Sequence, residues 1–101
     1  MLFITYWELD EAMSETERME AASKLSQIGP PEGIKLLRWD VTPDNWGIMI
    51  YEAENTVAIA KNFTLWRTKA GFFKYIKTSP LTPVEELMPQ LAAYLQSLQQ
   101  Q

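Results

Sequence analysis

The sequence predicts an α+β domain of the ferredoxin-like type, with elements in the order β-α-β-β-α-β and an additional C-terminal helix. Short runs of β-branched and aromatic residues alternate with stretches of helical periodicity, and Gly or Pro separates most of them. The length of 101 residues is that of one domain. We therefore predict a single domain over residues 1–101, built on a four-stranded antiparallel sheet.

The first strand and the first helix have clear local signals. The strand is predicted over Met1–Leu9, where the sequence reads MLFITYWEL. Ser14 and Glu17 have the spacing of a capping box, which starts a helix, and Gly29 ends it. The apolar face of this helix is predicted to consist of Ala21, Ala22, Leu25 and Ile28.

A hairpin is predicted next. Its strands are Ile34–Val41 (IKLLRWDV) and Trp46–Ala53 (WGIMIYEA), both rich in β-branched and aromatic residues. Between them stands TPDN, in which Pro43 and Asp44 are typical turn formers. The two strands should therefore pair as sequence neighbours.

A second helix and a fourth strand complete the predicted sheet. Asn55 is a suitable N-cap for the helix, and Gly71 is predicted to end it. The strand is predicted over Phe72–Thr78 (FFKYIKT). The apolar face of the helix is predicted to consist of Ile59, Phe63, Trp66 and Ala70.

The last helix is predicted to start at TPVE. Thr82 would cap it, Pro83 fits its first turn, and Glu85 occupies the third helical position. Pro89 lies inside the helix and should kink or delay it, at a cost of about 3 kcal/mol. The apolar face of this helix is predicted to consist of Leu87, Leu91, Tyr94, Leu95 and Leu98.

Both faces of the predicted strands are apolar, although a half-exposed strand normally alternates apolar with polar residues. Leu2, Ile4 and Tyr6 oppose Phe3 and Trp7, and Trp46, Ile48 and Ile50 oppose Met49 and Tyr51. One face can cover the helices, but the other would expose a large apolar patch. We expect a second copy to stack its sheet on this patch, which gives a homodimer of the dimeric α+β-barrel type. The predicted contacts are Phe3, Trp7, Trp46 and Ile48.

Such a contact would be strongly favourable. Burying on the order of 500 Å² of apolar area per subunit contributes more than roughly 10 kcal/mol before the costs of association.

The composition narrows the chemistry. The chain has no cysteine and no histidine, which excludes disulfides, thiolate catalysis, a Ser-His-Asp triad and histidine-ligated zinc or haem. We expect no cofactor and no metal site. The acidic cluster of Glu8, Asp10 and Glu11 is explained by a helix N-terminus, where carboxylates are favourable.

Neither a secretory signal nor an apolar run long enough to span a membrane stands in the sequence, so we expect a cytoplasmic protein without a membrane contact.

The whole chain, from MLFITYWEL through PLTPVEEL, resembles a family of small proteins of unknown function within the dimeric α+β-barrel superfamily. The most family-like stretch is FTLWRTKAGFFKYIKTSPL, in which a helix leads into an aromatic edge strand and then a proline. The resemblance implies the fold and a homodimer. It implies no reaction, because members of the superfamily do many different things.

Candidate catalytic residues follow from the same superfamily. Its cofactor-independent monooxygenases use an Asn, Trp and Tyr set in the cavity between sheet and helices, and Asn62, Trp66 and Tyr75 are similar in type. Asn62 and Trp66 lie one helical turn apart and share a face. The simpler interpretation is that Trp66 belongs to the core, while Asn62 faces solvent or caps a turn.

Ligand binding is the main functional hypothesis. We expect a small aromatic or apolar molecule in the sheet–helix cavity, with an aromatic lining of Tyr6, Trp39, Tyr51 and Trp66. Arg67 or Arg38 could hold a carboxylate or phosphate of the ligand, although a solvated or ion-paired arginine is the simpler role. The enzymatic alternative is a cofactor-independent monooxygenase or isomerase.

A nucleic-acid-binding module of the RNA-recognition type is the alternative from another class, since it shares the β-α-β-β-α-β order. Phe3 and Trp46 would then stack on bases. Asp44 stands where a basic residue is usual, and Ile48 stands where a second aromatic is usual. The net charge of −4 also argues against a polyanion partner. The basic residues between Asn62 and Lys77 are better explained as the solvated edge of the sheet.

Overall fold

The computed structural model of the protein describes residues 1–69 and 73–100, apart from the side chain of Tyr75. Within them lie strands of 8 residues and helices of 14 to 16 residues, and the predicted α+β class with an antiparallel sheet is confirmed. The elements are β1 (Leu2–Leu9), α1 (Glu15–Ile28), β2 (Ile34–Val41), β3 (Trp46–Ala53), α2 (Thr56–Lys69), β4 (Phe73–Pro80) and α3 (Val84–Gln99).

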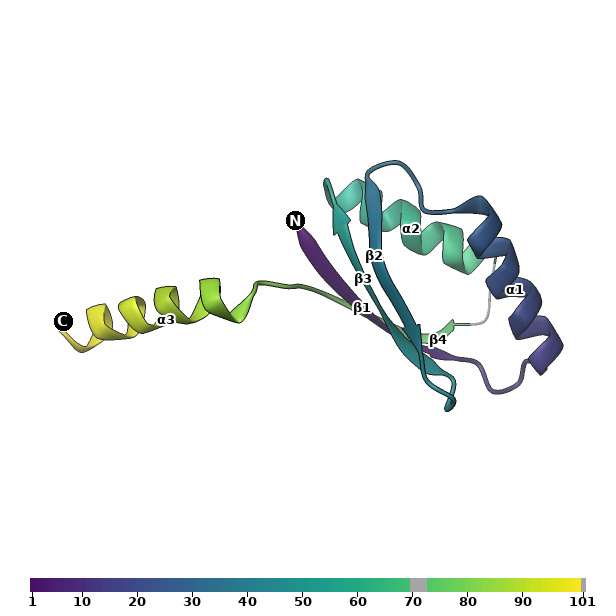
Figure 1. Ribbon diagram of the computed structural model, residues 1–101, viewed down its shortest axis with the longest axis horizontal. Coiled ribbons are helices and arrows are strands. Elements are labelled where there is room, and N and C mark those ends of the chain that lie inside the picture. Colours follow the sequence, from purple (N-terminus) through teal and green to yellow (C-terminus); the bar gives the residue numbers. More distant parts are fainter. Residues whose placement is uncertain (70–72, 101) are drawn as a thin grey trace.

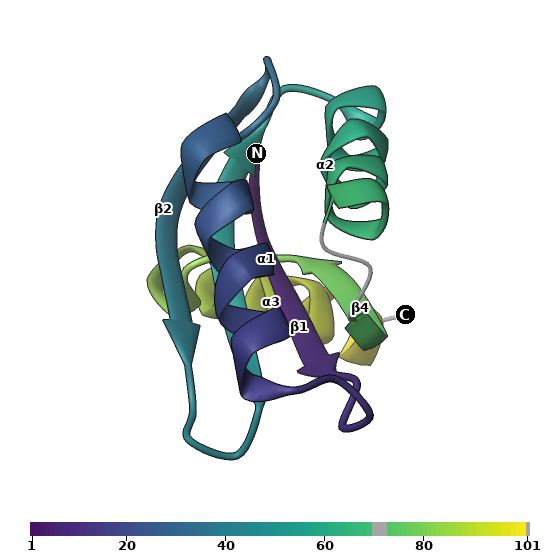
Figure 2. The same ribbon diagram turned by 90° about the vertical axis from the view of Figure 1, so that its right-hand side faces the viewer.

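The strands form one sheet in the order β2-β3-β1-β4, and each neighbouring pair is antiparallel. Helices α1 and α2 lie side by side over one face of this sheet, whereas α3 projects from the opposite side (Figure 1; Figure 2). We call the face that carries α1 and α2 the helix face, and the other one the open face. Because α3 points away from the sheet, no other element within residues 1–69 and 73–100 covers the open face (Figure 1).

Helix α1 starts and ends where its local signals place it. The Ser14 Oγ accepts from the Glu17 backbone N–H and the Glu17 carboxylate accepts from the Ser14 backbone N–H, so the capping box is confirmed. The hydrogen bonds from Ser14 also lower the pKa of the Glu17 carboxyl. Gly29 ends the helix with φ 75°, a conformation that favours glycine. Ala21 and Leu25 are buried, but Ala22 and Ile28 are exposed, so the predicted face is half right.

The β2–β3 hairpin turns at residues 42–45, as predicted. Asn45 adopts a φ of 62°, which asparagine tolerates better than most residues. Strand β2 contains a bulge between Leu36 and Arg38, where two residues oppose one on β3. Leu36 and Trp39 are three positions apart and would face opposite sides of a regular strand, but this extra residue places them on the same side of the sheet.

Helix α2 is rotated relative to the prediction. Asn55 caps it, since its Oδ1 accepts from the Ala58 N–H at 2.9 Å. The buried residues are Ala58, Asn62 and Trp66. Trp66 is therefore buried as predicted, whereas Ile59 and Phe63 are only partly buried. The rest of this prediction, namely Ala70 and the helix end at Gly71, lies outside the described residues.

Strand β4 runs to Pro80, two residues further than predicted, and its predicted first residue Phe72 lies outside the described part of the chain. Helix α3 begins at Val84 with Pro83 as its N-cap and has no side-chain cap, so the predicted Thr82 cap is wrong. The helix continues through Pro89 to Gln99.

The core lies between the helix face and the two helices. Trp7, Tyr51 and Trp66 are among its largest members, and each is 3% exposed or less. The Thr5 hydroxyl lies among them and bonds to the hydroxyls of Tyr51 (2.9 Å) and Thr78 (2.8 Å), which joins three strands through one buried polar chain. No helix in the described ranges is long and apolar enough to cross a membrane.

The predicted homodimer contact mixes the two faces of the sheet and needs correction. Trp7 is buried on the helix face, and Phe3 stacks there on Tyr51 with ring centroids 6.0 Å apart. Trp46 and Ile48 lie on the open face. The other large apolar residues of the open face are Leu2, Ile4, Tyr6 and Ile50.

Candidate functional site

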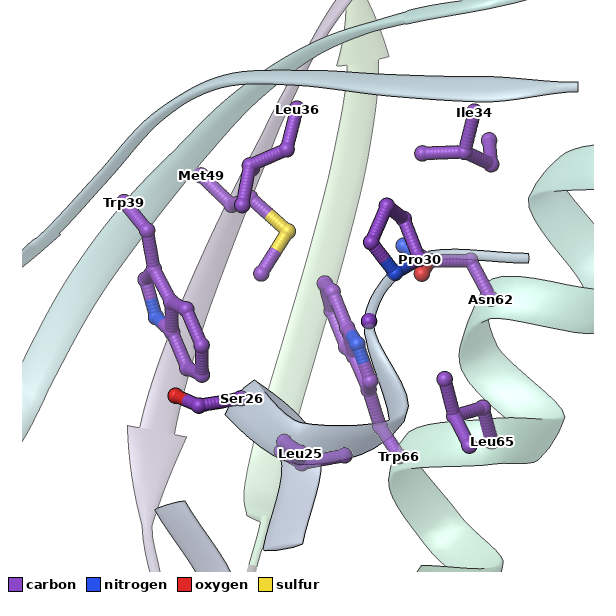
Figure 3. A pocket seen from close by; sticks show the side chains of 11 residues that line it. Leu25, Ser26, Pro30, Ile34, Leu36, Trp39, Met49, Asn62, Leu65 and Trp66 are labelled. Atoms are coloured by element: carbon purple, nitrogen blue, oxygen red, sulfur yellow. The ribbon is translucent and has the colours of Figure 1, made fainter. Parts of the chain in front are cut away.

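A pocket of about 230 Å³ lies between the C-terminal end of α1, strands β2 and β3, and helix α2 (Figure 3). Its wall is almost entirely apolar, with Trp39 on one side, Trp66 in the middle and Met49 behind them (Figure 3). The bulge in β2 is what brings Trp39 to this wall. None of the described residues that line the pocket is ionisable.

Asn62 is the unusual member of the wall. It lies on α2 one turn before Trp66, is only 2% exposed, and extends its amide toward Pro30 and the pocket (Figure 3). Its Nδ2 has no hydrogen-bond partner among residues 1–69 and 73–100. A buried amide donor without a partner costs about 1–3 kcal/mol, so its retention in an apolar wall calls for an explanation.

Trp66 is held in place by other aromatic rings. Phe63 meets it edge-on with ring centroids 5.5 Å apart, and Phe73 lies tilted against it at the same distance. Such contacts fix the ring beyond what area burial alone would give. The pocket wall on this side is therefore already packed in the absence of a ligand.

A second hollow of about 430 Å³ adjoins the first and shares Ser26 and Trp39 with it. It extends along α1 toward the end of β1, where Trp7 and Arg18 line it. The Arg18 guanidinium donates to the Glu15 carboxylate at 3.0 Å. The Arg18 Nε and the Trp7 Nε1 are buried and lack an acceptor within the described chain.

The structure brings some of the predicted ligand-binding residues together and separates others. Trp39 and Trp66 line the pocket, as predicted. Tyr51 is completely buried and its hydroxyl is bonded to Thr5, so it lies behind the wall. Tyr6 lies on the open face beside Trp46, with ring centroids 5.7 Å apart, and its predicted place in the cavity is wrong.

Both predicted anion-binding arginines are exposed and lie away from the pocket. Arg67 lies over the Phe63 ring at 5.7 Å, and Arg38 is paired with Asp40. Of the candidate catalytic residues, Asn62 and Trp66 meet in the pocket. The side chain of Tyr75 lies outside the described residues. The expectation that Asn62 faces solvent is wrong, because it is buried.

Sequence reasoning missed Arg18 and the loop that carries Pro30. The signal for Arg18 was present, because it precedes Ala21 by three residues and Leu25 by seven and so shares the inner face of α1. For Pro30 there was none, since nothing local shows that the turn after Gly29 folds over α2.

The structure also bears on the nucleic-acid alternative and on a possible metal site. The nucleic-acid alternative needs Phe3 on an accessible sheet surface, but Phe3 is partly buried on the helix face, where it packs against the core and stacks on Tyr51. In the described ranges no group of three or more carboxylates is placed to hold a metal ion.

A family model described as a domain of unknown function (DUF3303) matches residues 1–95, nearly the whole chain. No curated protein matches the sequence.

Proposed function

The chain belongs to the DUF3303 family, whose description assigns no activity, and we propose that it binds a small, mostly apolar molecule in the pocket between α1, α2 and the sheet. The ligand would carry one hydrogen-bond acceptor, such as a carbonyl oxygen, that meets the Asn62 amide. Trp39 and Trp66 would flank its apolar body.

One observation supports this proposal above the others, namely the Asn62 Nδ2 that is buried and finds no acceptor in the described chain. A ligand oxygen would remove the cost of that orphaned donor, whereas a purely apolar ligand would not. A trapped water is a weaker explanation, because a buried water needs two to four polar partners and the pocket wall is nearly all apolar.

The size of the pocket limits the ligand class. An engineered apolar cavity of about 150 Å³ binds benzene. The pocket here, at about 230 Å³, has room for one ring with a short substituent. Single-ring ketones, esters and amides therefore fit the volume and the placement of the donor.

The test compares two probes of the same shape. Acetophenone carries a carbonyl oxygen, and α-methylstyrene carries a methylene group in its place. We expect calorimetry to show that the protein binds acetophenone about tenfold more tightly, which corresponds to about 1.4 kcal/mol for one hydrogen bond. In Asn62→Leu the order should reverse, because the hydrocarbon is then easier to desolvate.

Thr68→Leu is the matched control. Thr68 is exposed on α2, and its replacement should leave the preference for acetophenone unchanged. Absence of binding of both probes at millimolar concentration would count against a ligand pocket of this size. Equal preference in the normal protein and in Asn62→Leu would remove Asn62 from the site.

A second candidate function is cofactor-independent oxygenation or isomerisation. The observation that favours it is that Asn62 and Trp66 line one pocket. The absence of an acid or base from the described wall makes binding the better supported function, because such a reaction needs a proton acceptor. Turnover of any substrate that persists in an Asn62→Ala, Trp66→Phe double variant would exclude this role for the pair.

We also infer that the fold is ferredoxin-like. The order of the elements and the strand order β2-β3-β1-β4 support this assignment, since both are the split β-α-β pattern predicted from the sequence.

A further inference from the structure

Helix α3 stands away from the rest of the molecule. Every one of its side chains is exposed, and it projects as an arm from the open side of the sheet (Figure 1). The chain therefore spans 59 Å along its longest axis, and its radius of gyration is 17.3 Å. A compact domain of this length has a radius of gyration of about 13 Å.

The sequence of α3 does not suit a helix surrounded by water. Its leucines, with Met88 and Tyr94, form one apolar stripe whose side chains are 38% to 62% exposed. No charged residue follows Glu86 in the chain, so the polar side of the helix carries only uncharged residues. An isolated helix of this length is marginal in water, and Pro89 removes one of its hydrogen bonds. A partner surface is therefore needed for α3 to persist.

The same molecule presents an apolar surface of the required kind. On the open face Ile4, Ile48 and Ile50 come from the two central strands, and Trp46 at the end of β3 is 38% exposed. Leu2 and Tyr6 extend this surface along β1. No helix from the described chain covers it (Figure 1; Figure 2). An apolar stripe and an apolar sheet face on one chain are complementary in chemistry.

The connector between β4 and α3 determines whether α3 can cover the open face of its own chain or only that of a second copy. It consists of residues 81–83 and is bracketed by Pro80 and Pro83. The Leu81 N–H donates to the Leu2 carbonyl at 2.8 Å, and Pro83 is extended at φ −56° and ψ 141°. To cover its own sheet, α3 would have to reverse direction within this segment, and proline restricts both itself and the residue before it. Short connectors of this kind favour exchange between copies.

We propose that two copies of this chain exchange their arms. Helix α3 of each copy packs its apolar stripe against the open face of the other, around a twofold axis. This contact takes the place of the sheet-on-sheet stacking expected from the sequence, because both would occupy the open face. Both unpaired surfaces are then covered by one symmetric contact, and each copy gives and receives the same element. This arrangement is independent of the ligand pocket, which lies on the helix face.

Light scattering over a range of concentration gives the first measurement. We expect a mass twice the 11.7 kDa of the chain. Leu91→Asp combined with Leu95→Asp places two charges in the stripe and should raise the dimer dissociation constant at least 100-fold. Because α3 contributes nothing to the described core, these changes should leave the sheet and the pocket intact, which probe binding or tryptophan emission can verify. The matched control is Ala93→Asp combined with Ser97→Asp, which places two charges on the opposite side of α3 and should leave the mass unchanged.

Cross-linking then identifies the chain that α3 covers. The protein has no cysteine, so Ile48→Cys and Leu91→Cys can be combined in one chain and joined with a bismaleimide of about 10 Å span. Arm exchange predicts a covalent dimer on a denaturing gel, and the Leu91→Cys single variant should give much less of it. A product that migrates as a monomer and contains a bridged peptide pair from β3 and α3 in its mass spectrum would show that α3 folds back on its own sheet, and would overturn the proposal. A monomeric mass for the normal protein, or a dimer that the paired aspartates do not weaken, would overturn it too.

Discussion

Replacement of Asn62 by leucine should raise the stability of the free protein. Asn62 is 2% exposed, and its Nδ2 has no acceptor among the residues that the structure describes. Removal of an orphaned donor recovers about 1–3 kcal/mol. The leucine side chain is slightly larger, but the pocket of about 230 Å³ beside it can accept the added volume. We therefore expect the free energy of unfolding to rise by about 1–3 kcal/mol.

The assay is urea unfolding at a fixed protein concentration, together with a thermal scan. For a domain of about this size, 1 kcal/mol moves Tm by roughly 4–8 °C, so the change is easily measured. Leucine also has a higher helix propensity than asparagine, by about 0.5 kcal/mol. The Thr68→Leu variant measures that contribution separately, because Thr and Asn have similar propensities and Thr68 is exposed on the same helix.

The result that would refute this reasoning is a loss of 1 kcal/mol or more in Asn62→Leu, relative to Thr68→Leu. It would mean that the amide is satisfied in the folded protein. A gain in stability with an unchanged preference for acetophenone would instead mean that the donor is orphaned but does not meet the ligand. A gain in stability combined with loss of that preference is the pattern of a residue kept for binding at the expense of stability.

Three further substitutions test the fold by urea unfolding. Gly47→Ala should lower the free energy of unfolding by about 3 kcal/mol or prevent folding, because a Cβ there would lie 2.5 Å from the Trp7 ring; a fully stable variant would contradict this close approach. Tyr51→Phe removes a buried hydroxyl bond of 2.9 Å and should cost about 1 kcal/mol, and no loss would show that the bond is absent. Ser14→Ala should cost about 1 kcal/mol at pH 7 through loss of the helix cap. Hydrogen bonds from the Ser14 backbone N–H and side chain lower the pKa of Glu17, so their stabilising effect is present above its unfolded pKa and is lost as the pH falls through its folded pKa. Alanine keeps the backbone N–H, so the penalty in Ser14→Ala should shrink in acid only by the side-chain share, and a penalty that grows in acid would contradict the cap.

The ends of most elements could be predicted because their signals are local. The capping box of Ser14 and Glu17, the glycine that ends α1 and the cap at Asn55 each depend on residues within one helical turn. The β2–β3 hairpin depends on a turn that its own four residues determine. Thr82 is the exception, since Pro83 takes the N-cap position in its place.

The assignment of faces could not be predicted in the same way. Alternation shows that Tyr6 and Phe3 lie on opposite sides of β1, but not which side meets the helices, because both sides are apolar. This ambiguity accounts for the misplacement of Tyr6 in the cavity and of Trp7 in the dimer contact. The bulge in β2 adds a second uncertainty, because it changes the parity of the strand without a Gly or Pro to mark it.

The site was only partly predictable for a related reason. Helical periodicity over apolar residues omits Asn62 from the buried face of α2 and favours a neighbouring set of positions. Long-range packing between the loop at Pro30 and α2 creates the pocket, and no local pattern encodes it. Trp39 and Trp66 were found because large aromatic residues in a small domain have few other places to lie.

The positions of the four tryptophans allow their intrinsic fluorescence to report on different parts of the protein. Trp39 and Trp66 line the pocket, Trp7 belongs to the core, and only Trp46 lies on the open face. A chain in which Trp46 is replaced by phenylalanine should therefore respond in its fluorescence to pocket occupancy but hardly to contacts on the open face. The difference between its emission and that of the normal chain gives the fluorescence of Trp46 alone. Titrations of the two proteins can therefore distinguish ligand binding in the pocket from contacts on the open face of the same sheet.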